Sequence, residues 1–168
     1  LKCPLKDLPL PPKKTSIEFN PTKLLIDLIE KPYWTFTQKE ASDTLIPDLI
    51  AINGSQFLIF DAKYYTPKLE LNQKPEHQPG IESVTKQYLY QLAYKDFIKA
   101  YEFTDIKNCF LMPTEKEDVQ NMGTVTMKMF RDLNLTDIEV RYIPATTAYR
   151  YYLSGATMNL SELKLEEK

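Results

Sequence analysis

The sequence contains little histidine and little cysteine. His77 is the only histidine among the 168 residues, and Cys3 and Cys109 are the only cysteines. Two distant, unaccompanied cysteines argue against both a structural zinc site and a disulfide framework. With a single histidine, which we expect to be exposed in a loop, neither a histidine-based metal-finger nuclease nor a paired-histidine phosphodiesterase is expected. Any catalytic site must therefore use other side chains.

Long apolar runs and a strong net charge are also missing. No apolar stretch approaches the roughly 20 residues that span a bilayer, and no signal peptide is visible, so we expect a cytoplasmic protein without a membrane partner. The net charge of −2 argues against a globally basic nucleic-acid binder. No G-x-x-x-x-G-K-[ST] motif occurs, so a nucleotide-driven motor would be on another chain. Because the sequence begins at Leu1 and not at Met, we expect a fragment of a longer protein.

The pattern of elements predicts one mixed α/β domain over residues 1–168, with an extended, proline-rich lead-in at 1–19 and a frayed, charged tail at 156–168. Apolar content of 43% is enough for a sizeable core. Residues 57–60 are apolar on both faces, as in a central strand. Periodicity and turn residues predict helices at 20–31, 83–103 and 145–155, strands at 33–36, 46–53, 56–65, 107–113 and 136–144, and an ambiguous segment at 115–135.

Two acids and a lysine stand at the ends of the predicted hairpin 46–65. Asn53-Gly54 favours an even-length turn. A two-residue turn there would pair Asp48 with Ile59, whereas a four-residue turn would place Asp48 opposite Asp61. Because strand residues alternate between faces, either turn puts Asp48, Asp61 and Lys63 on the same face, and an odd-length turn would separate them.

Two neighbouring carboxylates repel each other unless a cation lies between them. Mg²⁺ prefers such oxygen ligands and leaves other positions to water and phosphate. A nearby lysine could then bind a phosphodiester and offset transition-state charge. We therefore predict that the Asp48 and Asp61 carboxylates lie within about 6 Å of each other. The alternative is that Asp61 and Lys63 are a solvated strand end and Asp48 a turn acid.

The stretches "LIPDLIAINGSQFLIFDAKYY" and "VTKQYLYQLAYKDF" resemble the PD-(D/E)xK nucleases, and most closely the LlaJI-type restriction endonucleases, which are related to McrC-like nuclease subunits. The resemblance implies a restriction-endonuclease-like αβββαβ core with a mixed central sheet over about residues 20–145. It also implies metal ligation by Asp48, Asp61 and the Ala62 carbonyl, with Lys63 as the catalytic lysine. Mg²⁺ is the expected cofactor, and Mn²⁺ the expected substitute.

The predicted helix after the hairpin has a polar and aromatic face made by Gln87, Tyr90, Gln91 and Tyr94. Many related nucleases have a Gln/Tyr helix here, whose amide orients the lysine or a phosphate, so Gln87 is our candidate for a catalytic role. Those nucleases commonly place a tyrosine four residues after the glutamine, where this sequence has Gln91. The alternative is a solvated helix face with tyrosines that reach toward water.

The proline-containing segment 66–82 is predicted to be a mobile loop beside the active site. Its candidate DNA contacts, with those of the following helix, are Lys68, Lys74, His77, Lys86 and Gln91. Many family members add an acid from the helix before the sheet. The candidates for it are Asp27, Glu30, Glu40 or an acid before Leu1.

Together these features predict the catalytic domain of a restriction endonuclease in a bacterial restriction-modification defence system. The candidate partners are double-stranded DNA, a McrB-like GTPase subunit and a second copy of the chain. Two alternatives stay open. One is a DNA repair or recombination nuclease of the same fold, and the other is a non-catalytic DNA-binding or assembly module. Retention of the three signature charges, Asp48, Asp61 and Lys63, argues against the non-catalytic module.

Overall fold

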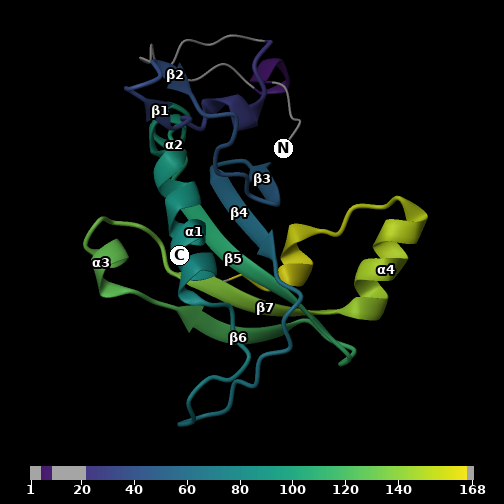
Figure 1. Ribbon diagram of the computed structural model, residues 1–168. Coiled ribbons are helices and arrows are strands. Elements are labelled where there is room, and N and C mark those ends of the chain that lie inside the picture. The colour runs from purple at the N-terminus through teal and green to yellow at the C-terminus, as the bar shows by residue number, and fades with distance from the viewer. Residues whose placement is uncertain (1–4, 9–21, 166–168) are drawn as a thin grey trace.

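The computed structural model describes residues 5–8 and 22–165, which build a sheet with helices packed on it (Figure 1). The central sheet has five strands in the order β3-β4-β5-β7-β6. These strands are β3 (Leu49–Asn53), β4 (Gln56–Ala62), β5 (Asp105–Thr114), β6 (Gln120–Val125) and β7 (Ile138–Pro144). The predicted mixed α/β class, with a central sheet flanked by helices, is confirmed.

The three inner strands run in the same direction. β4 is parallel to β5 and β5 is parallel to β7, while β3 and β6 are antiparallel edge strands. The carboxyl ends of β4, β5 and β7 therefore meet at one edge of the sheet. Helix α4 (Ala145–Ser154) follows β7 directly, so it also begins at this edge. The edge matters because β4 ends there with Asp61 and Ala62.

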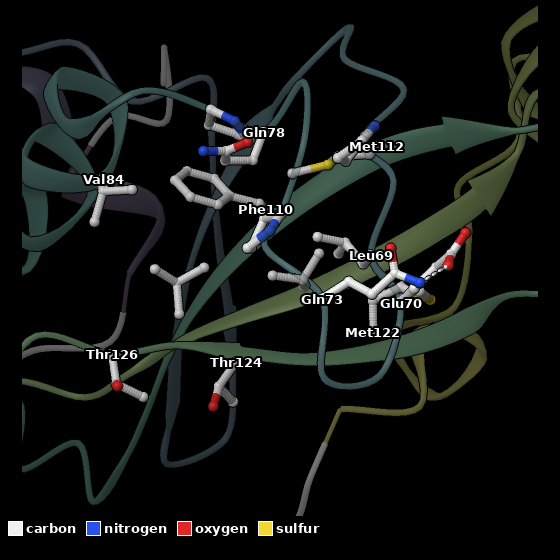
Figure 2. Close-up of a pocket in the computed structure, with 15 residues that line it drawn as sticks. Leu69, Glu70, Gln73, Gln78, Val84, Phe110, Met112, Met122, Thr124 and Thr126 are labelled. Atoms are coloured by element: carbon white, nitrogen blue, oxygen red, sulfur yellow. Dashed lines mark hydrogen bonds between the residues drawn. The ribbon is translucent and has the colours of Figure 1, made fainter.

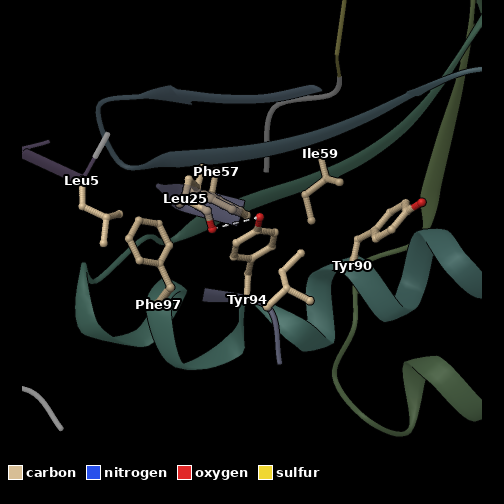
Figure 3. Close-up of a cluster of buried hydrophobic side chains, with 8 residues drawn as sticks. Leu5, Leu25, Phe57, Ile59, Tyr90, Tyr94 and Phe97 are labelled. Atoms are coloured by element: carbon tan, nitrogen blue, oxygen red, sulfur yellow. Dashed lines mark hydrogen bonds between the residues drawn. The ribbon is translucent and has the colours of Figure 1, made fainter. Parts of the chain in front are cut away.

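One face of the sheet is covered by α1 (Ile81–Ala93) and α2 (Lys95–Ala100). An aromatic core fills the space between these helices and the sheet (Figure 3). The Phe57 ring from β4 lies 5.4 Å from the Tyr94 ring and 5.8 Å from the Phe97 ring, measured between centroids. Leu5 of the 3-10 turn η1 (Leu5–Asp7) and Leu25 of η2 (Leu25–Leu28) complete this core. Part of the expected extended lead-in is thus packed.

The opposite face is covered by the C-terminal segment. Leu58 and Phe60 of β4 and Cys109 of β5 pack against Leu163 of η3 (Leu160–Leu163). Arg141, which is fully buried, donates hydrogen bonds to the Leu163 carbonyl at 3.1 Å and the Lys164 carbonyl at 3.1 Å. Residues 160–165 are therefore fastened to the sheet, where a frayed tail was expected. The remaining tail residues, 166–168, lie outside the described residues.

Several smaller elements differ from those expected. The described part of the predicted helix 20–31 contains only the single turn η2, because Ile29 is already extended at φ −80 and ψ 122. The ambiguous segment 115–135 forms strand β6 and helix α3 (Lys128–Arg131). A two-stranded sheet joins β1 (Tyr33–Trp34) to β2 (Lys39–Glu40). No helix in the described parts of the chain is both long and apolar enough to cross a membrane.

Candidate active site

The β3–β4 hairpin has an even-length turn, which lies one residue later than expected. Asn53 pairs with Gln56, so Gly54 and Ser55 form the loop. Gly54 takes the positive φ of 57°, which glycine adopts without strain, and the Asn53 amide donates to the Gln56 side chain at 3.1 Å. The last pair in this register is Leu49 with Phe60. One further step places Asp48 opposite Asp61, the arrangement expected from a four-residue turn.

The two acids come together at the end of β4. Asp48 Oδ2 accepts a hydrogen bond from the Ala62 backbone N–H at 2.8 Å. Asp48 is exposed, whereas Asp61 is only 5% exposed. Burial raises the pKa of Asp61, and the hydrogen bond and ion pair with Lys63 oppose that change. The charge of Asp48 and a side-chain hydrogen bond with it raise the Asp61 pKa further. The pair is thus one exposed and one buried carboxylate in direct electrostatic contact.

Lys63 is held beside this pair by its backbone and its side chain. Its backbone N–H donates to the Leu111 carbonyl at 2.8 Å, which extends the β4–β5 ladder past Ala62. Its Nζ forms an ion pair with Asp61 Oδ2 and lies 5.8 Å from the centroid of the Phe110 ring. The three signature charges predicted from the hairpin therefore meet at one place, at the carboxyl end of a central strand.

Gln87 reaches this strand from α1. Its side chain is fully buried, and its Nε2 donates to the Ile59 carbonyl at 3.0 Å. Its Oε1 is buried and has no hydrogen-bond partner among the described residues. A buried acceptor without a donor is costly. The alternative of a solvated helix face is therefore wrong for Gln87. Its side chain lies in the interior and contacts Ile59, which is two residues before Asp61 in β4.

The other residues on this helix face are also buried. Tyr90 donates from its hydroxyl to the Ile46 carbonyl at 3.1 Å, and burial, with the charges of Asp61 and Asp48, raises its pKa to about 12. Tyr90 is thus a neutral donor to the backbone two residues before Asp48, a contact that the sequence analysis did not assign to the site. Tyr94 donates to the Leu25 carbonyl at 3.3 Å in the core. The repeated Gln/Tyr pattern was the available signal for these contacts.

Gln91 makes its hydrogen bonds in the interior of the domain. Its Oε1 accepts hydrogen bonds from Asn108 Nδ2 at 2.9 Å, from the Thr136 N–H at 3.0 Å and from the Thr136 hydroxyl at 2.9 Å. The residue is 6% exposed. These contacts give Gln91 a packing role between α1, β5 and the segment before β7. A contact of this side chain with DNA stays a prediction.

The remaining candidate DNA contacts are exposed. Lys68, Lys74 and His77 lie in the segment between β4 and α1, which has no helix or strand apart from an isolated bridge between Lys68 and Glu76. Lys68 Nζ lies 3.8 Å from the Glu76 carboxylate, and Lys86 Nζ lies 3.1 Å from that of Glu82. Acids thus partly offset the positive charge of both lysines.

The candidate additional acids Asp27, Glu30 and Glu40 are all exposed. Asp27 Oδ2 also accepts a hydrogen bond from the Leu24 backbone N–H at 2.8 Å, which caps η2. Within residues 5–8 and 22–165, no group of three or more His, Cys, Asp or Glu side chains is arranged to hold a metal ion. A cation at Asp48 and Asp61 would therefore need backbone oxygen, water and phosphate as further ligands, a set that Mg²⁺ accepts.

Comparison with known proteins identifies the family. Residues 17–148 match the model of the LlaJI restriction endonuclease family, so the chain belongs to that family. It is also similar to the protein named Type II restriction enzyme BsuMI component YdjA from Bacillus subtilis strain 168, with 32% identity over 148 residues. The match covers 80% of this chain and 30% of that relative. The chain thus spans about a third of the length of its relative, and the resemblance to the LlaJI-type restriction endonucleases is confirmed.

Proposed function

We propose that this chain is the catalytic domain of a restriction endonuclease that hydrolyses DNA phosphodiester bonds with Mg²⁺. The observation that carries the proposal is the convergence of Asp48, Asp61 and Lys63 at the carboxyl end of β4. Family membership supports a restriction nuclease over the repair or recombination alternative. The metal is proposed from the donor set, which is two carboxylates and a backbone carbonyl.

The acidic pair is the proposed cation site. Asp61 is a buried carboxylate whose pKa is raised by burial and by Asp48, so a divalent cation would relieve both the burial cost and the repulsion. Asp48, Asp61 and the Ala62 carbonyl would hold it. Bound Mg²⁺ would supply Lewis acidity, which lowers the pKa of an attacking water and polarises the phosphate. Mn²⁺ offers similar coordination with oxygen ligands.

Lys63 is the proposed electrostatic catalyst. Its ammonium is paired with Asp61, and its side chain is 18% exposed, so it is partly desolvated but open to a ligand. A cation in such a place interacts more strongly with charge than a fully hydrated one. When the phosphate and its attacking water gain negative charge, the ammonium would stabilise that charge.

Gln87 is a proposed positioning residue. Its Nε2 fixes the Ile59 carbonyl, and its Oε1 is a buried acceptor that lacks a donor among the described residues. The Lys63 ammonium or an ordered water could supply that donor when substrate binds. Gln87 would thereby orient the lysine relative to the phosphate, as the resemblance to related nucleases implies.

The domain is proposed to act within a larger assembly. The Bacillus relative is named a component of a restriction enzyme, and this chain matches 30% of its length. DNA specificity or translocation would then come from other segments or from another subunit, such as a McrB-like GTPase. A second copy of the chain is a further candidate partner, since a double-strand cut needs two strand cleavages.

The test is nicking of supercoiled plasmid by the longest available form of the chain, together with its suspected partner, in Mg²⁺ or in chelator. Cleavage that requires Mg²⁺ and is lost in Asp61→Asn and Lys63→Ala is expected. Asp96→Asn and Lys95→Ala are matched controls, because both residues are exposed on α2, which carries none of the proposed site residues. Cleavage that persists in Asp61→Asn, or in chelator, would refute the proposed site.

A further inference from the structure

A cavity lies on the face of the sheet to which Phe110 projects (Figure 2). It has a volume of about 420 Å³ and lies between the segment 67–79 and the sheet. Phe110, Met112 and Val140 form its buried floor, while Gln78, Thr124 and Thr126 stand among its exposed lining residues. Binding sites for small ligands commonly have volumes of about 300–1,000 Å³. The cavity is therefore large enough for a single heterocycle.

The segment that encloses the cavity is fastened at several points. The Tyr142 hydroxyl donates to the Pro67 carbonyl at 2.8 Å, and Pro67 and Pro79 are buried. Backbone hydrogen bonds between Lys68 and Glu76, at 3.0 and 3.3 Å, close the segment into a hairpin-like loop. The outer wall of the cavity is thus held against the sheet by contacts from both of its ends.

The cavity shares a wall with the three signature charges. Phe110 pairs with Asp61 in the β4–β5 register, and parallel neighbours project to the same face of the sheet. The Lys63 ammonium lies 5.8 Å from the centroid of the Phe110 ring. A DNA strand whose phosphate reached Lys63 would therefore bring the adjoining nucleotides to the mouth of the cavity.

The chemistry of the lining suits a neutral ring. The side chains of Gln78, Thr124 and Thr126 make no hydrogen bond within the described chain, so their amide and hydroxyl groups are available to a ligand. The charged lining residue Glu70 already accepts a hydrogen bond from Gln73 at 2.7 Å. With an acid and no base in its lining, the cavity disfavours a phosphate. A nucleobase, with apolar faces and hydrogen-bonding edges, fits it better.

Two exposed tyrosines lie in the chain between Lys63 and the segment 67–79 that encloses the cavity. Tyr64 and Tyr65 directly follow Lys63 and are 92% and 41% exposed. No packing contact within the described residues accounts for a tyrosine as exposed as Tyr64. Aromatic rings stack on bases, and side chains that enter a base stack help to unstack it. An aromatic side chain at this point could occupy the space that an extruded base leaves.

We propose that the cavity receives one nucleobase extruded from the DNA next to the cleaved phosphate, with Tyr64 stacked in the gap that the base leaves. The proposal rests on the proposed function for its substrate, but the cavity can be tested without cleavage. An enzyme with this device would sense the identity or the pairing strength of one base pair beside the cut, because a weakly paired base costs less to extrude.

The first test measures binding of the four free deoxynucleosides to the chain by ligand-observed NMR, with deoxyribose as the negative probe. We expect weak binding of at least one nucleoside, with a Kd on the order of 1 mM. Thr126→Trp, which fills the cavity from an exposed position, should weaken it about tenfold or more. Thr157→Trp is the matched control, because Thr157 is exposed and is not part of the lining. Tyr64→Ala should leave nucleoside binding intact.

The second test measures cleavage of plasmid DNA by the assembled system. Thr126→Trp and Tyr64→Ala should each lower the rate, while Thr157→Trp should not. Nucleoside binding without DNA cleavage by the wild type would refute the proposed function and leave the cavity assignment standing. Normal cleavage by Thr126→Trp, or nucleoside binding equal to that of the wild type, would overturn the cavity assignment and leave the proposed function standing.

Discussion

Replacement of Lys63 by alanine should separate catalysis from binding. Lys63 Nζ is paired with Asp61 and is 18% exposed, so its charge acts in a partly desolvated place. Electrostatic groups of this kind typically contribute about 10²–10³ in rate, or roughly 3–4 kcal/mol. Lys63→Ala should lose that factor in cleavage while DNA binding persists. Lys63→Arg should recover only part of it, because a planar guanidinium does not reproduce a compact ammonium.

The same change should lower stability in a pH-dependent way. Asp61 is only 5% exposed, and Lys63 is its ion-pair partner. Removal of Lys63 would leave a buried carboxylate without this counter-charge, which should cost about 1–3 kcal/mol in the free energy of unfolding near neutral pH. Burial already raises the Asp61 pKa above its ordinary 3.8, and Lys63 opposes this. An acid with a raised pKa in the folded protein loses stability as pH rises through the interval between the unfolded and folded values. The deficit of Lys63→Ala should therefore shrink as pH falls toward about 4.

The assays are plasmid nicking at matched Mg²⁺ and urea unfolding at about pH 7 and pH 4. Lys95→Ala, an exposed change on α2, controls for loss of a surface lysine. Asp61→Asn combined with Lys63→Ala should regain most of the stability, because no unpaired carboxylate is left. Equal nicking rates for wild type and Lys63→Ala would remove Lys63 from the mechanism. An unfolding deficit that does not depend on pH would refute the assigned Asp61–Lys63 coupling.

Three further changes test a hydrogen bond beside the site, the proposed DNA contacts of the loop and the packing of the C-terminal segment. Tyr90→Phe removes the hydrogen bond to the Ile46 carbonyl and should cost about 1 kcal/mol, with weaker Mn²⁺ binding measured by calorimetry. Lys68→Ala combined with Lys74→Ala should lower the slope of log affinity against log salt by about one unit per lysine, measured in DNA titrations. Leu163→Ala should cost about 2–5 kcal/mol in urea unfolding, because Leu163 is buried against the sheet.

The signature charges could be predicted because the hairpin that joins them is local. Alternation along a strand and the parity of one turn decide whether Asp48, Asp61 and Lys63 share a face. The register itself was not fixed by this reasoning. The turn lies one residue later than expected, and the Asn53 amide donates to the Gln56 side chain across it, a contact that forms only once the strands are paired.

The C-terminal segment shows what sequence patterns miss. "SELKLEEK" is charged and has no clear period, so it reads as a frayed end. The packing of the described residues 160–165 depends on Arg141, a buried guanidinium about 20 residues away along the chain, which needs acceptors and takes the carbonyls of Leu163 and Lys164. A buried arginine in an alternating strand gives no local sign of which backbone will satisfy it.

The polar face of α1 follows from what the helix has to hold. Gln87 donates to the carbonyl of Ile59, two residues before Asp61, and Tyr90 donates to the carbonyl of Ile46, two residues before Asp48. Helix α1 therefore holds, by one hydrogen bond each, the segment before Asp61 and the segment before Asp48. An apolar face would lose both of these hydrogen bonds, each of which contributes about 0.5–1.5 kcal/mol. Because the two donors lie about one turn apart on the same helix, α1 holds the two segments together near the place where the hairpin register brings the carboxylates opposite each other.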